Sequence, residues 1–543
     1  MKRAFFAILM LWLAPSVRAQ YVSKAWNPDL GNGDYRNPVL NADYSDPDVC
    51  AVGGDFYLTA SSFNCVPGLP ILHSRDLVNW TIVGHALMEQ LPGDVFDKPQ
   101  HGKGVWAPSI RYHEGMYYIY WGDPDQGIFM VKTRDPRGPW TTPVCVVAGR
   151  GMIDPCPLWD EDGRCYLVNA WAASRSGFNS VLTVRELSAD GTRVVGQPSI
   201  AFDGGQAHHT TEGPKFYKRD GWYWILCPAG GVQMGWQVAM RSHSPYGPYE
   251  ARTVMAQGQT HVNGPHQGAW VTTEKGEDWF LHFNDRGAYG RVVFLQPMSW
   301  RDGWPVIGVD KDGDGVGEPV MKYRKPIAGE TNTNPQESDE FDQPTLGRQW
   351  QWHANYNQLW GMPTANGMMR LYTNDRGGGN LWTAPYLLLQ KTPAERFTMT
   401  AKVCMAAKAA DQYGGLLVMG RDYGALVIRR TDDHFVVQGL SCLGADEGGP
   451  ETIDTYAQME PTDRDTIPYS PAQYLTIYLR VRVRDGQYAF AYSTDGKRYR
   501  DVGPLRTLKE GRWIGAKVGL FAERNGAEGN RGWLDVDWVR ITD

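Results

Sequence analysis

The first half of the chain repeats one pattern of apolar and polar positions five times. Each copy has a glycine turn, an aromatic or alternating strand, a second strand, and a turn that contains tryptophan or proline. The first strands follow Gly54, Gly115, Gly163, Gly221 and Gly276. These glycines are 61, 48, 58 and 55 residues apart, about the length of a four-stranded propeller blade with long loops. The pattern predicts an all-β chain with a five-bladed β-propeller over residues 20–326.

A polar segment follows the last repeat and separates it from a second β-rich region. Residues 327–337 contain Gly, Glu, Thr, Asn and Pro with few apolar positions, a composition typical of a linker. Alternating stretches then occur at residues 397–403 and 475–481, and the chain closes with another at 533–541. We expect residues 338–543 to form a separate β-sandwich domain.

The N-terminus has the order of charges and apolar residues found in export signals. Lys2 and Arg3 precede a short apolar run at residues 5–13, and Ala19 ends a small-residue cleavage pattern. The alternative is a buried N-terminal helix. We interpret residues 1–19 as a signal peptide, which places the protein in the bacterial periplasm or the medium. Because no second long apolar run follows, no membrane span is expected.

Composition narrows the class of protein further. The formal net charge is −6, so the chain lacks the basic footprint of a nucleic-acid binder. It is rich in Trp, Tyr and Gly, which suits short strands and tight turns better than helices. The eight cysteines form an even set that permits disulfides. They show neither CxxC nor zinc-like spacing, and most are interpreted as small buried apolar residues.

The repeat also indicates where chemistry is to be sought. About eight to ten residues before each glycine lies a segment marked by Pro or Gly that leads into the innermost strand. In chain order these segments contain Asp46, Ala107, Asp154, Glu212 and His266. Such positions would meet at the propeller axis, and converging carboxylates suit general acid–base chemistry. The alternative is that Asp-Pro and Glu-Gly-Pro are only turn formers, but three carboxylates in one phase favour a functional site.

At these positions the sequence resembles the family 43 glycoside hydrolases. The motifs that carry the resemblance are NPVL (37–40), YSDPD (44–48), GVWAPS (104–109), IDP (153–155), TEGP (211–214), GPHQG (264–268) and GWP (303–305). The resemblance implies an inverting exo-hydrolase that acts on a plant polysaccharide or oligosaccharide. The second half resembles the concanavalin-like β-sandwich appended to many of these enzymes.

The resemblance also implies roles for individual residues. Asp46 takes the position of the general base and Glu212 that of the general acid. Asp154 is the third carboxylate, which raises the pKa of the acid by like-charge repulsion and orients it. Arg291 lies near the family's sugar-binding arginine. Inversion requires the acid and base about 6.5–9.5 Å apart, with water between the base and the sugar.

Further candidates lie around these residues. Trp106 and Phe63 either wall the sugar subsite or pack in the core. His266 either binds a cation or water in the channel, as in the family, or is a hydrogen-bonded histidine without metal. By analogy with the sandwich, a structural Ca²⁺ is expected between Asp339 and Asp537, and no other cofactor is required.

A separate stretch, residues 310–315, starts like a calcium loop. It lacks the acidic twelfth ligand, where Met321 stands. We therefore interpret it as an acidic turn.

Three functions remain open at this point. The first choice is release of terminal α-L-arabinofuranosyl residues, and the second is a β-xylosidase that uses the same carboxylates. The third is a propeller that binds sugar without catalysis, which intact acid and base positions disfavour. The sandwich is either a carbohydrate-binding module or, as we favour, a packing partner that shapes one wall of the pocket. The oligomeric state is not indicated.

Overall fold

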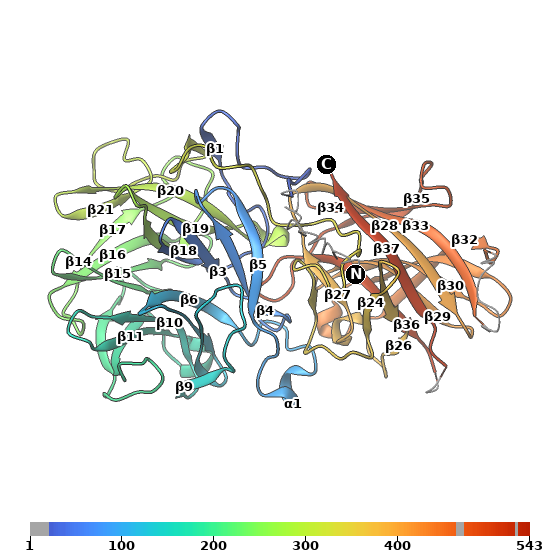
Figure 1. The fold of residues 1–543 in the computed structure, drawn as a ribbon, viewed down its shortest axis with the longest axis horizontal. Coiled ribbons are helices and arrows are strands. Elements are labelled where there is room, and N and C mark those ends of the chain that lie inside the picture. The colour runs from blue at the N-terminus through green and yellow to red at the C-terminus, as the bar shows by residue number, and fades with distance from the viewer. Residues whose placement is uncertain (1–20, 463–471, 527–529) are drawn as a thin grey trace, which may run out of the picture.

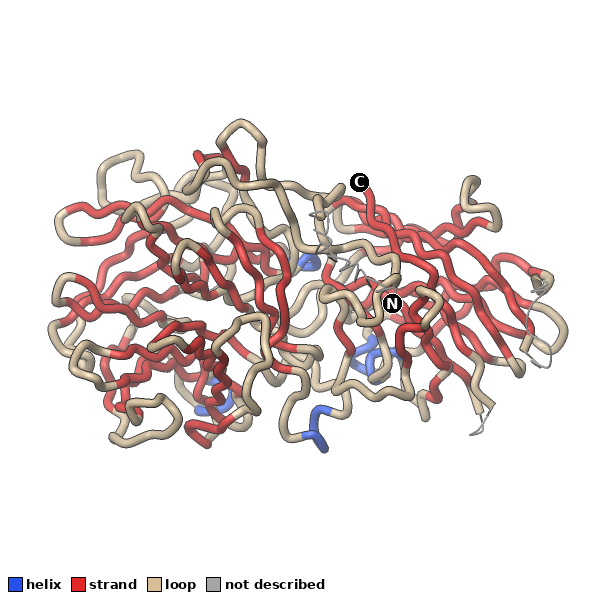
Figure 2. Tube along the Cα trace, viewed as in Figure 1, coloured by secondary structure: helices blue, strands red, loops and turns tan. Residues whose placement is uncertain are grey.

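The computed structural model describes residues 21–462, 472–526 and 530–543. Two β-rich bodies lie side by side, with the N-terminal propeller on the left of Figure 1 and the C-terminal sandwich on the right. Strands account for nearly all the regular structure, and the few helices are single turns (Figure 2). The predicted signal peptide lies outside the described residues. Among those that are described, no helix has the length and apolar character needed to span a membrane.

The propeller consists of five four-stranded antiparallel sheets, each built from consecutive strands. The first two blades are β2 (Asp48–Val52), β3 (Asp55–Thr59), β4 (Gly68–Ser74), β5 (Trp80–Leu87) and β6 (Trp106–His113), β7 (Met116–Asp123), β8 (Gly127–Thr133), β9 (Val144–Ala148). The third is β10 (Met152–Trp159), β11 (Cys165–Trp171), β12 (Val181–Leu187), β13 (Ser199–Asp203). The last two are β14 (Lys215–Arg219), β15 (Trp222–Ala229), β16 (Trp236–Ser242), β17 (Glu250–Met255) and β18 (His266–Thr272), β19 (Asp278–Asp285), β20 (Arg291–Arg301), β21 (Trp304–Ile307). The predicted fold is confirmed.

The five glycines that revealed the repeat occupy the same turn in every blade. Each lies between the first and second strand and has a φ between 76° and 81°. Glycine adopts this left-handed conformation without the steric cost that a Cβ brings. The phase of the glycines therefore reports the phase of the blades.

Apolar side chains are shared between neighbouring blades, so the propeller has a ring of small cores. In β7, Tyr117, Ile119 and Trp121 pack toward the first blade, whereas Tyr118 and Tyr120 pack toward the third. This follows from the two-residue period of a strand, which sends successive side chains to opposite faces. Both faces of β7 are thus buried, which explains its aromatic and apolar composition.

A two-stranded sheet joins the beginning and the end of the propeller. β1 (Asp34–Arg36) pairs antiparallel with β22 (Lys322–Arg324). The remaining short elements are α1 (Gly93–Phe96), α2 (Ala173–Ser176), η1 (Gly287–Tyr289), η2 (Leu381–Thr383) and η3 (Ala445–Glu447). Residues 327–337 form neither helix nor strand. All eight cysteines lie in described segments and are free thiols, seven of them buried.

The sandwich packs two large sheets face to face. One sheet contains β23 (Gln351–Trp352), β26 (Asn374–Asp375), β27 (Leu388–Lys391), β29 (Gln412–Met419), β30 (Tyr423–Arg430), β31 (Phe435–Cys442), β32 (Glu451–Met459) and β36 (Lys517–Arg524). The other contains β24 (Gly361–Thr364), β25 (Met368–Tyr372), β28 (Arg396–Ala407), β33 (Gln473–Arg484), β34 (Gln487–Ser493), β35 (Arg500–Thr507) and β37 (Trp533–Thr542). Alternate apolar residues of β33, such as Ile477 and Val481, enter the shared core.

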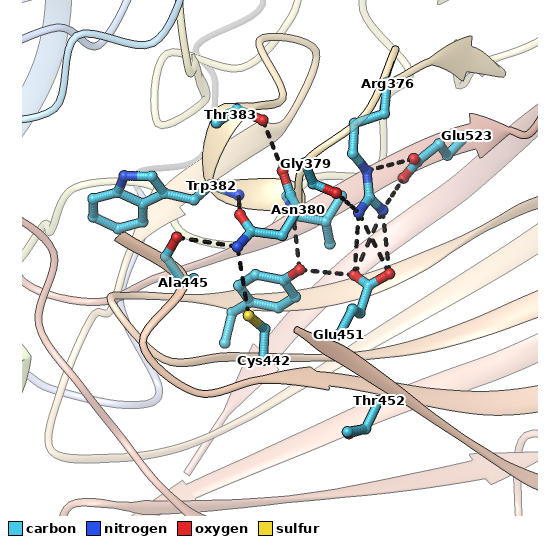
Figure 3. Close-up of polar contacts among 12 residues, drawn as sticks. Arg376, Gly379, Asn380, Trp382, Thr383, Cys442, Ala445, Glu451, Thr452 and Glu523 are labelled. Atoms are coloured by element: carbon cyan, nitrogen blue, oxygen red, sulfur yellow. Dashed lines mark hydrogen bonds and ion pairs between the residues drawn. The ribbon is translucent and has the colours of Figure 1, made fainter. Parts of the chain in front are cut away.

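A buried polar cluster binds the segment around η2, residues 376–383, to the first of these sheets (Figure 3). The Arg376 guanidinium donates to both carboxylate oxygens of Glu523, at 2.6 and 2.8 Å, and also reaches Glu451 at 3.4 Å. Tyr423 donates to the same Glu451 at 2.7 Å, and Asn380 donates to the carbonyl of Ala445 at 3.0 Å. Both β29 and β30 are buried along their whole length, because this segment covers part of the sheet that would otherwise be open.

Replacing Arg376 by Met should destabilise the sandwich by about 3 kcal/mol, because Glu523 then keeps a buried charge without a partner. The free energy of unfolding of each variant is measured by chemical unfolding and by calorimetry. The control is Arg396→Met, whose guanidinium pairs with Asp485 at an exposed site and should change stability by less than about 1 kcal/mol. Equal stability of the two variants would contradict this account of the cluster.

Candidate active site

The backbone takes the same unusual conformation at the start of each inner strand. Asp46, Ala107, Asp154, Gly213 and Gln267 all have left-handed φ values, of 55°, 35°, 56°, 58° and 24°. In β6, β10 and β18 the residue causes a shift of register with the neighbouring strand. Bulges of this kind redirect a side chain near the end of a strand. Here the repeated bulge surrounds one end of the propeller axis.

The repeat is not strictly in register for all the predicted site residues. Asp46 and Asp154 occupy the left-handed position itself. Glu212 and His266 lie one residue earlier, because Gly213 and Gln267 take that position in the fourth and fifth blades. The sequence pattern treated these positions as equivalent, and the structure corrects that point. A shift of one residue does not remove either side chain from the site, because both still line the same pocket.

A pocket opens where these segments meet, and the empty space inside it and at its open mouth together amounts to about 510 Å³. Seven of its lining residues are those singled out from the sequence: Asp46, Phe63, Trp106, Asp154, Glu212, His266 and Arg291. The others are Ala107, Ile153, Val232, Gln267 and Trp513. The structure therefore brings together all the residues predicted for catalysis and sugar binding, from all five blades.

Asp46 is surrounded by hydrogen-bond donors. Its Oδ2 accepts from Ser45 Oγ at 2.7 Å and from Ser61 Oγ at 2.5 Å. Its Oδ1 lies 3.5 Å from the Arg291 guanidinium, which also donates to Ser45 Oγ at 2.9 Å. The side chain is almost completely buried. Two hydroxyl donors and an adjacent guanidinium make Asp46 a hydrogen-bond acceptor.

Asp154 is the buried member of a pair of carboxyl groups with Glu212. Burial and the charge of nearby Glu212 raise the pKa of Asp154 well above its ordinary value, although the backbone N–H of Gly213 donates to it at 2.8 Å. Gln267 donates to the same oxygen at 3.2 Å. Glu212 is more exposed to the pocket, with its side chain 28 % accessible. Because burial and the charge of Glu212 favour the neutral form of Asp154, Asp154 keeps its proton to a higher pH than an isolated carboxyl group does.

His266 lies beside this pair at the floor of the pocket. Its Nε2 is 3.3 Å from Glu212 Oε1, but neither ring nitrogen makes a hydrogen bond to a described residue. The ring packs against Phe283 and is 1 % exposed. Two unpartnered nitrogens on a buried ring fit the predicted role of binding a cation or water, and that role stays a prediction.

Three aromatic rings form one wall of the pocket, and one of them comes from the sandwich. Phe63 and Trp106 make an edge contact with ring centroids 6.4 Å apart, and Trp106 makes another with Trp513 at 6.2 Å. Trp513 lies in the loop between β35 and β36 and is half exposed. The sandwich therefore supplies part of the pocket, although Trp513 is about 400 residues from Trp106 in the sequence.

Comparisons with known proteins agree with this architecture. The model of "Glycosyl hydrolases family 43" matches residues 35–305, and that of the "Beta xylosidase C-terminal Concanavalin A-like domain" matches residues 338–542. A relative from Xylanibacter ruminicola, named "Putative beta-xylosidase", is 35 % identical over 93 % of this chain and 90 % of its own. The chain belongs to glycosyl hydrolase family 43.

Two further relatives of this family 43 glycosidase are informative. One from Bacteroides ovatus, named "Non-reducing end alpha-L-arabinofuranosidase BoGH43B", is 29 % identical over 99 % of this chain and 98 % of its own. The crystal structure of a xylan beta-1,4-xylosidase from Bacillus halodurans superimposes with a TM-score of 0.80, at 24 % identity over 94 % of this chain and 100 % of that one. The latter likeness shows the shared fold.

The calcium expected in the sandwich of this family 43 enzyme has a poor donor set. Asp339 accepts from the N–H of Phe341 and from Trp350 Nε1, both at 2.9 Å, and Asp537 pairs with Lys402 at 2.6 Å. Because both carboxylates are bound by donors of the chain, the arrangement does not fit a cation between them.

Over the described segments, the one cluster of three or more potential ligand groups is Asp310, Asp312 and Asp314. There Asp310 accepts from the backbone of Gly313 and Gly315, as expected for an acidic turn.

The raised pKa of Asp154 should make the stability of the propeller depend on pH. The folded state holds this proton more tightly than the unfolded state, so stability falls as pH rises from the ordinary carboxylate range through the raised pKa. The slope is about 1.4 kcal/mol per pH unit inside that interval. Asp154→Asn should lack this fall in calorimetric scans between pH 4 and 8. The exposed Asp162→Asn should behave like the parent protein, and identical slopes in all three proteins would refute the assignment.

Proposed function

We propose that this family 43 glycosidase releases a single pentose from the end of a plant polysaccharide or oligosaccharide, with inversion at the anomeric carbon. The proposal rests on one observation: Asp46 and Glu212 lie in the same pocket but have different surroundings. Asp46 accepts hydrogen bonds from two hydroxyl groups, whereas Glu212 lies beside Asp154, a buried carboxyl group whose pKa is raised. An inverting hydrolase needs one group of each kind.

In this mechanism Asp46 accepts a proton from the attacking water as the bond from that water's oxygen to the anomeric carbon forms. Glu212 donates a proton to the glycosidic oxygen as the bond from the anomeric carbon to that oxygen breaks. Arg291 orients Asp46 through their 3.5 Å contact. Asp154 lies beside Glu212 as a buried carboxyl group whose raised pKa favours its protonated form, and in this mechanism the proton that the pair holds passes through Glu212 to the leaving group.

The shape of the pocket supports attack on a terminal sugar. Phe63, Trp106 and Trp513 form an aromatic wall on one side, and His266 and the carboxyl groups form the floor. Aromatic side chains and a few convergent polar groups are typical of small-molecule sites. We expect the pocket to hold one pentose ring, with the rest of the substrate chain extending out through the mouth.

Among pentoses, we propose a β-xylosyl residue as the preferred substrate. The relative named as a β-xylosidase is more similar to this chain, at 35 % identity, than the one named as an α-L-arabinofuranosidase, at 29 %. The arabinofuranosyl residue, first choice from the sequence, is the second candidate because the Bacteroides ovatus relative matches nearly the whole chain.

The roles of acid and base separate in a comparison of leaving groups. Asp46→Asn should lower kcat at least about 1,000-fold for every pentoside, because activation of water is lost whatever the leaving group. Glu212→Gln should lower kcat about as much for xylobiose. For 2,4-dinitrophenyl β-D-xylopyranoside the loss of kcat in Glu212→Gln should be about 100-fold smaller, because this leaving group needs little protonation.

Asp162→Asn, an exposed change outside the pocket, controls for handling. Full activity of either pocket variant on xylobiose would overturn the catalytic assignment. Wild-type protein that binds xylose or arabinose but cleaves no pentoside would instead favour the propeller that binds sugar without catalysis.

The substrate and stereochemistry are read in one series of NMR spectra. We expect kcat/KM to be about tenfold higher for aryl β-D-xylopyranoside than for aryl α-L-arabinofuranoside, a difference of about 1.4 kcal/mol in transition-state binding. The first product observed from the xyloside should be α-xylose. A preference for the arabinoside would select the second candidate, and β-xylose as first product would exclude inversion.

A further inference from the structure

A buried carboxylate outside the pocket joins three parts of the molecule. Asp43 precedes the first blade and is 3 % exposed. Its Oδ1 accepts from the backbone N–H of Arg291 at 2.9 Å, and its Oδ2 accepts from the backbone N–H of Gly515 at 2.9 Å. Arg291 begins strand β20 of the fifth blade, whereas Gly515 belongs to the sandwich. One side chain thus connects the first blade, the fifth blade and the second domain.

The backbones around Asp43 are too close together to admit further side chains. A Cβ on Gly290 would lie 2.4 Å from Asp43 Cγ, and Gly290 has a φ of 79°. A Cβ on Gly515 would lie 2.6 Å from the nitrogen of Gly290. The N–H of Ala516 donates to the carbonyl of Ala288 at 2.7 Å. The sandwich loop is therefore fitted against the fifth blade, with Asp43 as the side chain that bonds to both.

The loop fixed in this way carries a wall of the active site. Trp513 lies two residues before Gly515 and has a left-handed φ of 64°. A Cβ on Gly102 would lie 2.9 Å from the Trp513 ring, so the indole packs closely against the propeller. The same ring lies 5.9 Å from the Arg291 guanidinium. Release of the loop would move the indole away from the sugar without moving the carboxyl groups.

We propose that Asp43 is a positioning residue that holds the sandwich loop 511–515, and with it Trp513, at the pocket. The proposal rests on the proposed function, because it assigns Trp513 to substrate binding. Asp43 acts on affinity through the aromatic wall, whereas Asp46 and Glu212 carry the bond-breaking step. The sandwich is then a working part of the pocket and not only a covering domain.

The test uses the isosteric variant Asp43→Asn in the full chain. The amide oxygen accepts from one of the two N–H groups and the NH2 opposes the other, so whichever hydrogen bond is lost, this side chain no longer ties loop 511–515 to the fifth blade. Hydrogen exchange measured by mass spectrometry should become about tenfold faster in peptides spanning 511–516, the factor for one lost buried hydrogen bond. KM for the preferred pentoside should rise about tenfold, and kcat should stay within about twofold.

Asp97→Asn is the matched control. Asp97 lies at the end of α1 and accepts an interdomain hydrogen bond from Asn355 at 3.1 Å. Its substitution should leave the exchange rate of loop 511–516 and KM unchanged. In a Trp513→Ala background, Asp43→Asn should change KM by less than about twofold, because the group it positions is gone.

Unchanged exchange in the loop, or a tenfold rise of KM in both backgrounds, would overturn the proposal. An inactive wild-type protein would defeat the proposed function, while the exchange measurement would still decide whether Asp43 holds the loop.

Discussion

The left-handed residue at the start of each inner strand is the constraint on which the site depends. A non-glycine residue in this conformation costs about 1–2 kcal/mol, and Asp46 and Asp154 both adopt it. Their side chains recover that cost through the donors that meet them, Ser45 and Ser61 for Asp46 and the Gly213 N–H for Asp154. The backbone conformation directs each carboxylate toward the pocket, and the hydrogen-bond donors around it fix its orientation.

Below the pocket, other charged groups hold the blades together. Asp48 lies two residues after Asp46 and is fully buried, where it accepts from the Ile110 N–H at 2.8 Å and from Arg111 at 2.6 Å. The Lys215 ammonium crosses from the fourth blade to the carbonyl of Pro108 at 2.9 Å. The motif that supplies Asp46 therefore also supplies a structural ion pair. Because the ring of blades has no single core, such contacts near the axis help to fix the spacing of its inner strands.

Much of the propeller could be predicted from the sequence because its signals are local and repeated. Each of the five glycines marks a turn with nearly the same φ, and the three carboxylates lie eight or nine residues before the glycine of their blade. The one-residue offset of Glu212 and His266 could not be predicted, since it depends on which residue takes the left-handed conformation. Trp513 was also missed. It reaches the pocket from another domain, and no pattern around it distinguishes it from other surface aromatics.

The same reasoning explains the uneven outcome in the sandwich. The alternation of apolar and polar residues in segments such as β33 predicted a β-sandwich, because a period of two residues is visible within a single segment. The covering of one sheet by the chain around η2 rests on Arg376 and Glu523, which are 147 residues apart. Asp43 and Gly515 are separated by 472. Contacts of this separation leave no trace in local periodicity.

The origin of Trp513 in the second domain has a consequence for how such enzymes diversify. The carboxyl groups and the Trp513 ring that lines the pocket are encoded in separate halves of the chain, in elements with different structural roles. Changes in the loop at 511–515 can alter the outline of the pocket while the bulged strands of the propeller remain as they are. One lineage can therefore explore new sugars and linkages by varying a loop of its accessory domain, with its acid–base chemistry inherited intact.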